Sequence, residues 1–193
     1  MIDLLTYLLA LLPFYLIGAF PTGMIVARRY GVAIDRKGSG NVGAANVYRV
    51  VGKGPAALTL FGDAVKGVLA VTLGSLFASD LGFPNAAGLA AVLGHCVSIP
   101  PLLRGGKGVA TSLGVVLVLA PTLAAVATGV YVVGAKLSGM SAVGSLAAAL
   151  LTPLFTLLFG MGDLLFQTTA ALAVIIVVRH RTNIERLIEG KRG

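Results

Sequence analysis

Long runs of residues without a charge are the feature that most constrains what this chain can fold into. The runs contain 24, 23, 28, 26 and 15 residues and occupy 4–27, 81–103, 108–135, 137–162 and 164–178. A helix needs roughly 20 apolar residues to cross a bilayer. Only 11% of the residues are charged and 57% are hydrophobic, whereas a soluble domain is about one quarter charged. The pattern predicts an all-α integral membrane protein and excludes a soluble domain, a coiled coil and a disordered chain.

The positions of the basic residues predict which side of the membrane each connection occupies. Of the 15 Lys and Arg residues, 14 fall in alternate connections or in the tail: Arg28, Arg29, Arg36, Lys37, Arg49, Lys53, Arg104, Lys107, Lys136, Arg179, Arg181, Arg186, Lys191 and Arg192. The remaining connections carry Asp3, Asp80 and Asp163. Under the positive-inside rule the basic connections are cytoplasmic, so the N-terminus is outside and the C-terminus is cytoplasmic. Membrane topology accounts for the net charge of +8 without any nucleic acid.

Pro121 decides how many helices the chain contains, because it lies near the middle of the 28-residue run. One kinked helix through it would place both Lys136 and the basic tail outside. Two short helices, over about 109–120 and 122–135, keep every basic connection inside. We therefore expect about seven transmembrane helices in a single domain, 1–193, with the two short helices supported by protein neighbours. A cleaved signal peptide is not expected, since no basic residue precedes the first apolar run.

The first polar cluster is a glycine-rich segment, 37–49, in the first basic connection. Gly38, Gly40 and Gly43 allow tight turns, and we expect Ser39 or Asn41 to cap a short helix that runs on to Arg49. Such a helix start offers free N–H groups to an anion, and an arginine binds phosphate through two hydrogen bonds. The alternative is an ordinary solvated loop with a helix cap.

The second cluster runs from His95 to Ser112 and contains the sequence Gly105-Gly106-Lys107-Gly108. Successive glycine N–H groups form a concave anion site, and Lys107 adds a positive charge. A nucleotide P-loop is excluded, because it requires glycine at 101 and Ser or Thr at 108. His95 lies inside the third predicted helix, where a polar residue is a candidate functional group. The alternative is a histidine that a neighbouring helix satisfies.

The third cluster, 179–190, follows the last predicted helix and contains His180 and Asn183. Its alternative interpretation is a basic membrane anchor. The second predicted helix is the apolar segment 54–79, in which Asp63 and Lys66 lie on one face at i, i+3. They form either an ion pair that holds the bundle together or a support for a cytoplasmic site. Because all three clusters are predicted at the cytoplasmic face, we expect one site for a doubly anionic ligand.

These clusters resemble the motifs of the bacterial acyl-phosphate:glycerol-3-phosphate acyltransferases, the PlsY family. The matching segments, in order, are Ser39-Gly40-Asn41-x-Gly43-Ala44-x-Asn46-x-x-Arg49, Gly94-His95 with Gly105-Gly106-Lys107-Gly108-Val109-Ala110-Thr111, and His180-x-x-Asn183-Ile184-x-Arg186-Leu187-x-x-Gly190. Asp63 and Lys66-Gly67 match a charged patch in the family's second helix. The resemblance covers almost the whole chain.

The resemblance implies transfer of a fatty acyl group from acyl phosphate to the 1-hydroxyl of glycerol 3-phosphate. The products are lysophosphatidic acid and inorganic phosphate, and no metal, nucleotide or other cofactor is needed. It implies a monomer in the bacterial inner membrane, in contact with the lipid bilayer and not with nucleic acid, with a cytoplasmic active site. By the resemblance the catalytic residues are Ser39, Arg49, Lys107, His180 and Asn183. The substrate-binding residues are Gly40, Asn41, Asn46, Lys66, His95, Gly105, Gly106, Gly108 and Thr111.

The proton of the attacking hydroxyl has two possible destinations. The family's proposed mechanism sends it to a phosphate oxygen of the substrate, and the alternative is His95 or His180 as a general base. The chain departs from the family after Gly190, where Lys191 stands in place of an acidic residue. The main rival function is a transporter of a small phosphorylated solute, and a purely structural membrane subunit is a third. The predicted outer connections are short and carry no polar motif, which disfavours transport.

Overall fold

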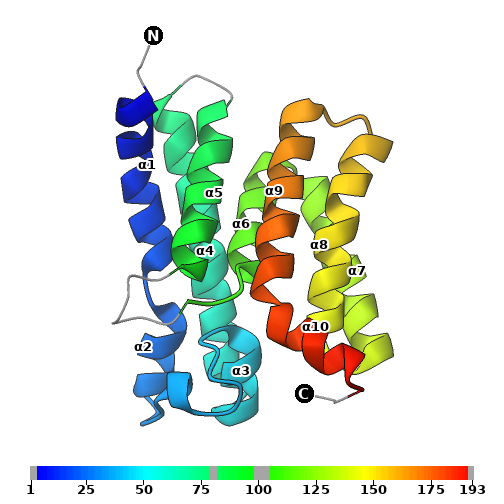
Figure 1. Cartoon of the computed structure of the whole chain (residues 1–193). Helices are drawn as coiled ribbons and strands as arrows, with labels where there is room; N and C mark the ends of the chain where they lie inside the picture. Colours follow the sequence, from blue (N-terminus) through cyan, green and yellow to red (C-terminus); the bar gives the residue numbers. More distant parts are fainter. Residues whose placement is uncertain (1–3, 79–81, 98–104, 191–193) are drawn as a thin grey trace.

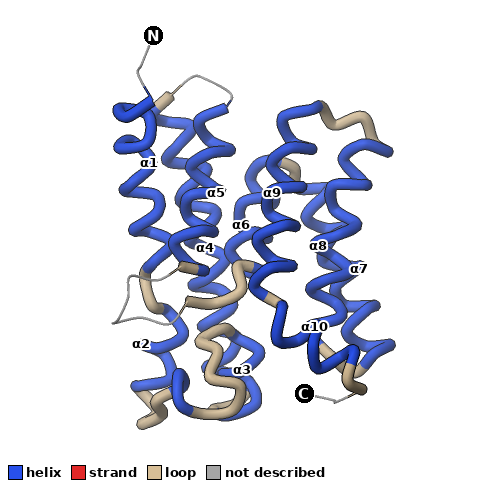
Figure 2. Tube along the Cα trace, viewed as in Figure 1, coloured by secondary structure: helices blue, strands red, loops and turns tan. Residues whose placement is uncertain are grey.

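The computed structural model describes residues 4–78, 82–97 and 105–190, and these ranges contain helices and loops but no β-strand (Figure 1, Figure 2). The helices are α1 (Leu4–Ala19), α2 (Thr22–Arg28), the 3₁₀-helix η1 (Ile34–Arg36), α3 (Ala44–Val50), α4 (Lys53–Phe77), α5 (Gly82–Cys96), α6 (Val109–Leu119), α7 (Pro121–Ser138), α8 (Ser141–Leu158), α9 (Asp163–Arg179) and α10 (Arg181–Ile188). The all-α prediction is confirmed. Asp3, Asp80, Arg104, Lys191 and Arg192 lie outside the described residues.

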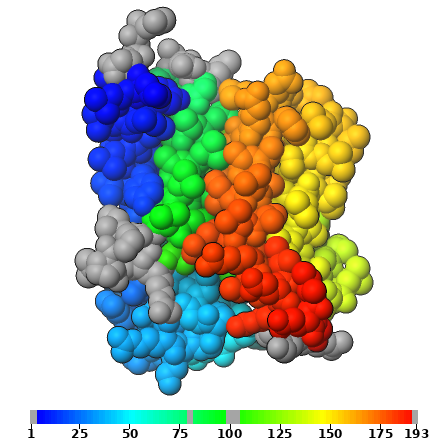
Figure 3. Space-filling model, in the orientation of Figure 1, coloured from blue at the N-terminus to red at the C-terminus, as the bar shows by residue number. Residues whose placement is uncertain are grey.

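The longer helices lie side by side, and the short ones gather at one end of the bundle (Figure 1). α1 packs on α5, α4 packs on α5 and α6, and α8 packs between α7 and α9. The space-filling view shows α10 at the same end as α2 and α3, opposite the end at which α1 begins (Figure 3). The first and third polar clusters of the sequence are therefore carried to the same end of the molecule.

The outer surface of the bundle is apolar, as expected for contact with lipid. Along α1 alone, Leu5, Leu9 and Leu12 are each more than half exposed. By length and hydropathy, 4 helical segments can cross a membrane: Leu4–Arg28, Lys53–Phe77, Pro121–Ser138 and Ser141–Leu158, and the bent pair α9–α10 makes up to 5. Several other helices are shorter than a bilayer requires, so the count of seven spans and their orientation stay predictions.

The chain breaks at Pro121, and the prediction of two short helices in place of one kinked helix is confirmed. α6 ends at Leu119, and α7 begins at Pro121, which occupies the first turn of its helix. Proline is tolerated there because the first N–H groups of a helix have no intrahelical acceptor. The protein neighbours expected around the shorter helix are also present, since α6 packs against α4, α5, α7 and α9.

Glycines at the helix crossings allow α6 to lie directly against α4. A Cβ added at Gly67 of α4 would lie 2.1 Å from the Thr111 carbonyl oxygen, and one added at Gly114 of α6 would lie 2.0 Å from that of Ala64. Small residues on both helices are what such a close approach requires. This crossing fixes the position of the first turn of α6, which carries part of the second polar cluster.

Candidate active site

One large cavity, with a volume of about 1280 Å³, brings the three polar clusters together. Eleven of the 14 predicted site residues line it: Ser39, Gly40, Asn41, Asn46, Arg49, His95, Gly105, Lys107, Gly108, His180 and Asn183. The other three, Lys66, Gly106 and Thr111, lie directly behind this lining and do not face the cavity. The three motifs, which are distant in the sequence, therefore lie around one cavity, and their roles in a common site stay predictions.

Asn46 organises the loop of the first cluster. Its side chain is 1% exposed, and its Nδ2 donates to the carbonyl oxygens of Lys37 at 2.9 Å and Asn41 at 2.8 Å. Its Oδ1 accepts from the Ser39 N–H at 3.0 Å. Because both ends of the amide are engaged by the loop, Asn46 holds the shape of the cavity wall.

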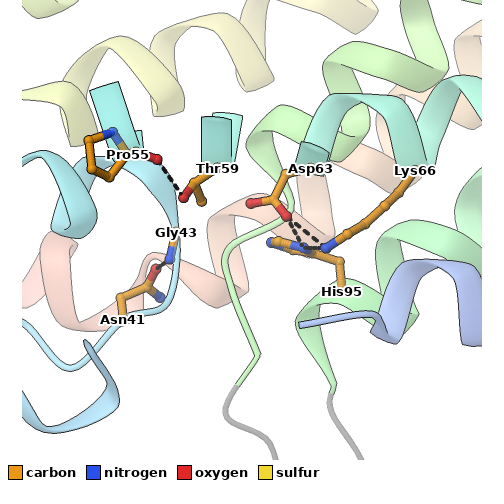
Figure 4. A network of polar contacts seen from close by, with 7 residues as sticks. All are labelled: Asn41, Gly43, Pro55, Thr59, Asp63, Lys66 and His95. Atoms are coloured by element: carbon orange, nitrogen blue, oxygen red, sulfur yellow. Dashed lines mark hydrogen bonds and ion pairs between the residues drawn. The ribbon is translucent and has the colours of Figure 1, made fainter. Parts of the chain in front are cut away.

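The helix cap predicted in this loop is wrong in its detail. α3 is capped by Gly43, and no side chain accepts a hydrogen bond at that cap. The Asn41 Oδ1 instead accepts from the Gly43 N–H at 2.8 Å (Figure 4), and the Ser39 Oγ accepts from the Asn41 N–H at 3.5 Å. These two side chains turn the chain before the helix, because each bonds a backbone group two or more residues ahead of it.

Arg49 ends the first cluster with an available positive charge. It lies in the last turn of α3, is exposed and lines the cavity. It forms no hydrogen bond or ion pair with any residue in the described part of the chain. A guanidinium with all its donors free is suited to a phosphate or carboxylate ligand.

Lys107 contributes the central cation of the second cluster. Its Nζ donates to the Asn183 Oδ1 at 2.5 Å, which joins the second cluster to the third. Burial, together with the nearby charges of Arg49, Arg186 and Arg179, lowers the pKa of Lys107 to about 8. Because these positive charges repel one another, a ligand with more than one negative charge would stabilise them together.

The glycine pair before Lys107 is held by Arg179. The Nε of Arg179 donates to the Gly106 carbonyl oxygen at 3.1 Å, and its Nη2 donates to that of Gly105 at 3.2 Å. The Gly106 N–H donates to the His95 carbonyl oxygen at 2.9 Å. Arg179 was not among the predicted site residues. Its place next to His180 was a signal, but backbone contacts between distant segments leave no pattern in the sequence.

A buried trio of charged and polar groups supports this glycine pair (Figure 4). The Lys66 Nζ lies 2.7 Å from the Asp63 Oδ1 and 3.4 Å from the His95 Nδ1, and all three side chains are almost fully buried. A Cβ added at Gly106 would lie 2.0 Å from the His95 Nε2. Asp63 and Lys66 form the expected ion pair within α4, and the contact of Lys66 with His95 places the pair beside the glycine segment. A role of the pair in supporting the site stays a prediction.

His180 lies at the 62° bend between α9 and α10, with its side chain buried. Its Nδ1 lies 2.8 Å from the Ile176 carbonyl oxygen. Since a carbonyl only accepts, Nδ1 carries the proton and Nε2 is left as an acceptor. The pKa of His180 is lowered to about 4, chiefly by burial; the Ile176 hydrogen bond opposes this shift and the Lys107 charge adds to it. His180 is therefore neutral near pH 7.

The rest of the cavity is an apolar arm between α6, α7, α8 and α9, which sequence reasoning did not anticipate. The apolar residues of the arm are Leu113, Val116, Ala127, Val132, Ala148, Ala149, Leu172, Ala173 and Ile176. Hydroxyl groups of Thr128, Ser145, Thr152 and Thr169 share the lining, but each donates to a carbonyl oxygen of its own helix. Each helix contributes only a few small or branched side chains, so no single segment stands out in the sequence. The combination of a cationic region and an apolar arm fits a ligand with an anionic head and a hydrocarbon chain.

The acidic residue that the sequence lacks after Gly190 has no evident replacement in the cavity. Glu185 and Glu189 lie on α10 or at its end, and neither lines the cavity. The position of the departure itself, Lys191, lies outside the described residues. Within the described lining, Asp63 is the only carboxylate, and it is paired with Lys66.

Comparison with known proteins places this geometry in a family. A family model described as glycerol-3-phosphate acyltransferase matches residues 8–190. The glycerol-3-phosphate acyltransferase of Geobacter sulfurreducens is 43% identical over 180 residues, which cover 91% of each chain. That of Synechococcus sp. strain JA-3-3Ab is 45% identical over 189 residues, covering 96% of this chain and 92% of the relative.

Two solved structures share the fold. Both are crystal structures of PlsY (YgiH), an integral membrane glycerol 3-phosphate acyltransferase. The glycerol 3-phosphate form has a TM-score of 0.89 at 33% identity, and the lysophosphatidic acid form has a TM-score of 0.85 at 34% identity. Each comparison covers 97% of this chain and 94% of the solved chain.

Proposed function

Because this chain belongs to the glycerol-3-phosphate acyltransferase family, we propose that it transfers a fatty acyl group from acyl phosphate to the 1-hydroxyl of glycerol 3-phosphate. The observation that carries the proposal is the junction, within one cavity, of a cationic region and an apolar arm. The cationic region suits the phosphates of both substrates, and the apolar arm suits the acyl chain. The products are lysophosphatidic acid and inorganic phosphate.

The chemistry needs positioning more than it needs a protein nucleophile. The acceptor oxygen forms a bond to the acyl carbon, the bond from that carbon to the phosphate oxygen breaks, and the hydroxyl proton passes to a phosphate oxygen. No serine or cysteine in the described chain is hydrogen-bonded to a histidine, so no activated nucleophile of the Ser-His type faces the cavity. Holding two substrates in contact within one cavity supplies much of the rate enhancement by itself.

Each polar residue has a role suited to its contacts. Arg49, Lys107 and Ser39 bind phosphate oxygens, together with the glycine backbone beside Lys107. Asn183 orients the acceptor, since its Oδ1 already bonds Lys107. Asn46, Lys66 and Gly106 hold the walls of the site. We expect the protein to act as a monomer, as the family resemblance implies.

The decisive assay for this function follows phosphate release by the purified protein. We expect release from acyl phosphate to require glycerol 3-phosphate and to match lysophosphatidic acid in amount. Acyl thioesters should not replace acyl phosphate as the donor. Transport of a phosphorylated solute into sealed vesicles without acylation would favour the rival function. The cavity argues against that rival, because no residue of α1 or of the α8–α9 connection lines it.

We place the site on the cytoplasmic side of a bacterial inner membrane, because the basic connections and the polar clusters share one end of the bundle. Cysteines replacing Ser39 or Asn183, in a Cys96→Ala background, should react with a membrane-impermeant maleimide only from the cytoplasmic side. The control is Phe159→Cys, at an exposed position between α8 and α9. It should react only from outside, and labelling with the two sides exchanged would refute the orientation.

The lowered pKa of Lys107 predicts how activity depends on pH. Lys107 loses its proton as the pH rises through about 8, so phosphate binding should weaken and KM should rise above that pH. Arginine stays charged throughout this range. Lys107→Arg should therefore remove the alkaline rise in KM, even where the altered geometry lowers kcat. An unchanged alkaline limb in the variant would assign the titration to another group.

A pKa of about 4 makes the neutral imidazole of His180 a weak proton acceptor, so we expect that no protein base is indispensable. Glutamine in place of His180 or His95 keeps a hydrogen-bonding side chain but cannot titrate. Each variant should retain measurable turnover, reduced by misplaced substrate, with the shape of the pH–rate profile unchanged. If one variant loses both kcat and a pH limb, that histidine is the general base and the substrate phosphate is not.

A further inference from the structure

Ser112 is a buried hydroxyl in the cavity wall that has no hydrogen-bond partner. It lies in the first turn of α6, is 5% exposed and lines the cavity. Its Oγ is buried, and no residue of the described chain accepts or donates a hydrogen bond there. A buried polar atom without a partner costs free energy, so its retention in a cavity wall indicates a partner that arrives with the ligand.

The other hydroxyls in the helices behave differently. Nine of them bond back to a carbonyl oxygen three or four residues earlier: Thr59, Ser75, Thr128, Ser138, Ser145, Thr152, Thr156, Thr168 and Thr169. The corresponding acceptor for the Ser112 Oγ would be the Gly108 carbonyl oxygen, which accepts from the Ser112 N–H at 2.7 Å but not from the hydroxyl. The Thr111 Oγ1 is also unpaired, but Thr111 does not line the cavity.

Further donors surround this hydroxyl. The N–H groups of Val109, Ala110 and Thr111 precede the first intrahelical bond of α6, and they have no backbone partner in the described chain. The positive end of the helix dipole lies at the same place. Val109 and Ala110 line the cavity beside Ser112. A hydroxyl and free N–H groups at a helix start form a donor set for an oxygen that gains negative charge.

The position of Ser112 along the cavity indicates which oxygen of the substrate would meet these donors. Val109, Ser112, Leu113 and Val116 form an i, i+3, i+4, i+7 stripe along the face of α6 that lines the cavity. The stripe begins next to Lys107 and ends in the apolar arm, and Ser112 is the polar side chain at the transition. In an acyl phosphate the carbonyl group lies between the phosphate and the hydrocarbon chain, in the same order.

We propose that Ser112 is a catalytic residue whose hydroxyl donates a hydrogen bond to the acyl carbonyl oxygen as that oxygen becomes negative. The inference rests on the proposed acyl transfer. During attack by the acceptor hydroxyl, the carbonyl π electrons move onto this oxygen, and they return when the bond to phosphate breaks. A preorganised donor at that position stabilises the transition state more than the ground state.

The test compares Ser112→Ala with the matched control Ser75→Ala. Ser75 is a helical serine of α4 that lies outside the cavity. Ser112→Ala should fold as the parent, since the hydroxyl makes no bond within the protein. Its kcat should fall roughly tenfold to a hundredfold, with the KM for both substrates nearly unchanged. Ser112→Thr, which keeps the hydroxyl, should recover part of the loss, and Ser75→Ala should match the parent.

A spectroscopic readout separates this role from phosphate binding. The infrared band of a ¹³C-labelled ester carbonyl in bound lysophosphatidic acid should lie at lower frequency in the parent than in Ser112→Ala. Parental kcat in a folded Ser112→Ala, an unshifted carbonyl band, or a rise in the KM for glycerol 3-phosphate alone would each overturn the proposal. A parent protein that fails to acylate glycerol 3-phosphate would instead overturn the proposed function.

Discussion

Replacement of Arg49 or Lys107 by alanine is expected to lower kcat/KM by about ten- to a hundredfold while leaving the helix bundle intact. Each change removes a charge-assisted hydrogen bond to a substrate phosphate, which is worth roughly 1.5–3 kcal/mol. Arg49 forms no bond within the described protein, so its loss costs the fold little. Steady-state kinetics with each substrate varied in turn will show which phosphate each cation binds.

The matched control for these variants is Arg36→Ala. Arg36 belongs to the same connection as Arg49, its side chain is 84% exposed, and it does not line the cavity. Its replacement should leave kcat/KM unchanged. Parental activity in a folded Arg49→Ala or Lys107→Ala protein would remove that residue from the site. An equal loss in Arg36→Ala would indicate a general effect of surface charge.

Gly106→Ala is expected to reduce turnover by about a hundredfold, because displacement of a positioned group by about 1 Å has an effect of that size. The added Cβ would lie 2.0 Å from the His95 Nε2, and the ring cannot retreat because Lys66 and Asp63 hold its other side. The loop must shift instead, and Lys107 shifts with it. Single-turnover and steady-state rates of the purified variant will measure the loss.

Two further variants test the physical cause. Gly129→Ala adds a Cβ to a helical glycine with no atom within 4 Å, so it should have parental activity. In a His95→Ala background, the further change Gly106→Ala should cost far less than in the parent, because the colliding ring is gone. Equal costs in the two backgrounds would show that the His95 ring is not the obstacle.

The general architecture could be predicted because charge is expensive inside a bilayer. Uncharged runs marked the helices, and the basic residues separated one set of connections from the other. The break at Pro121 was predicted from the same charges and is present in the fold. The predicted pair was right to within three residues at each end, since α7 continues to Ser138. Fraying and capping at helix ends depend on local contacts that periodicity does not contain.

It could also be predicted that the three motifs lie close together, but the contacts that each residue makes there could not. Glycine-rich and basic motifs on one side of a bundle are brought together by topology alone. Asn46 and Arg179 show what was hidden, because both act through backbone carbonyl groups of other segments. The apolar arm was hidden for a similar reason, since four helices form it with ordinary apolar residues. Ser112 could not be predicted, because only the structure shows that its Oγ is buried without a hydrogen-bond partner.

The measurement that tests the account most directly is phosphate exchange in the absence of glycerol 3-phosphate. In the proposed reaction both substrates occupy one cavity, and the acyl group passes directly between them. Purified protein with unlabelled acyl phosphate and ³²P-labelled inorganic phosphate should therefore form no labelled acyl phosphate. Lysophosphatidic acid should form once glycerol 3-phosphate is added. Labelled acyl phosphate formed without the acceptor would reveal an acyl-enzyme intermediate and contradict direct transfer.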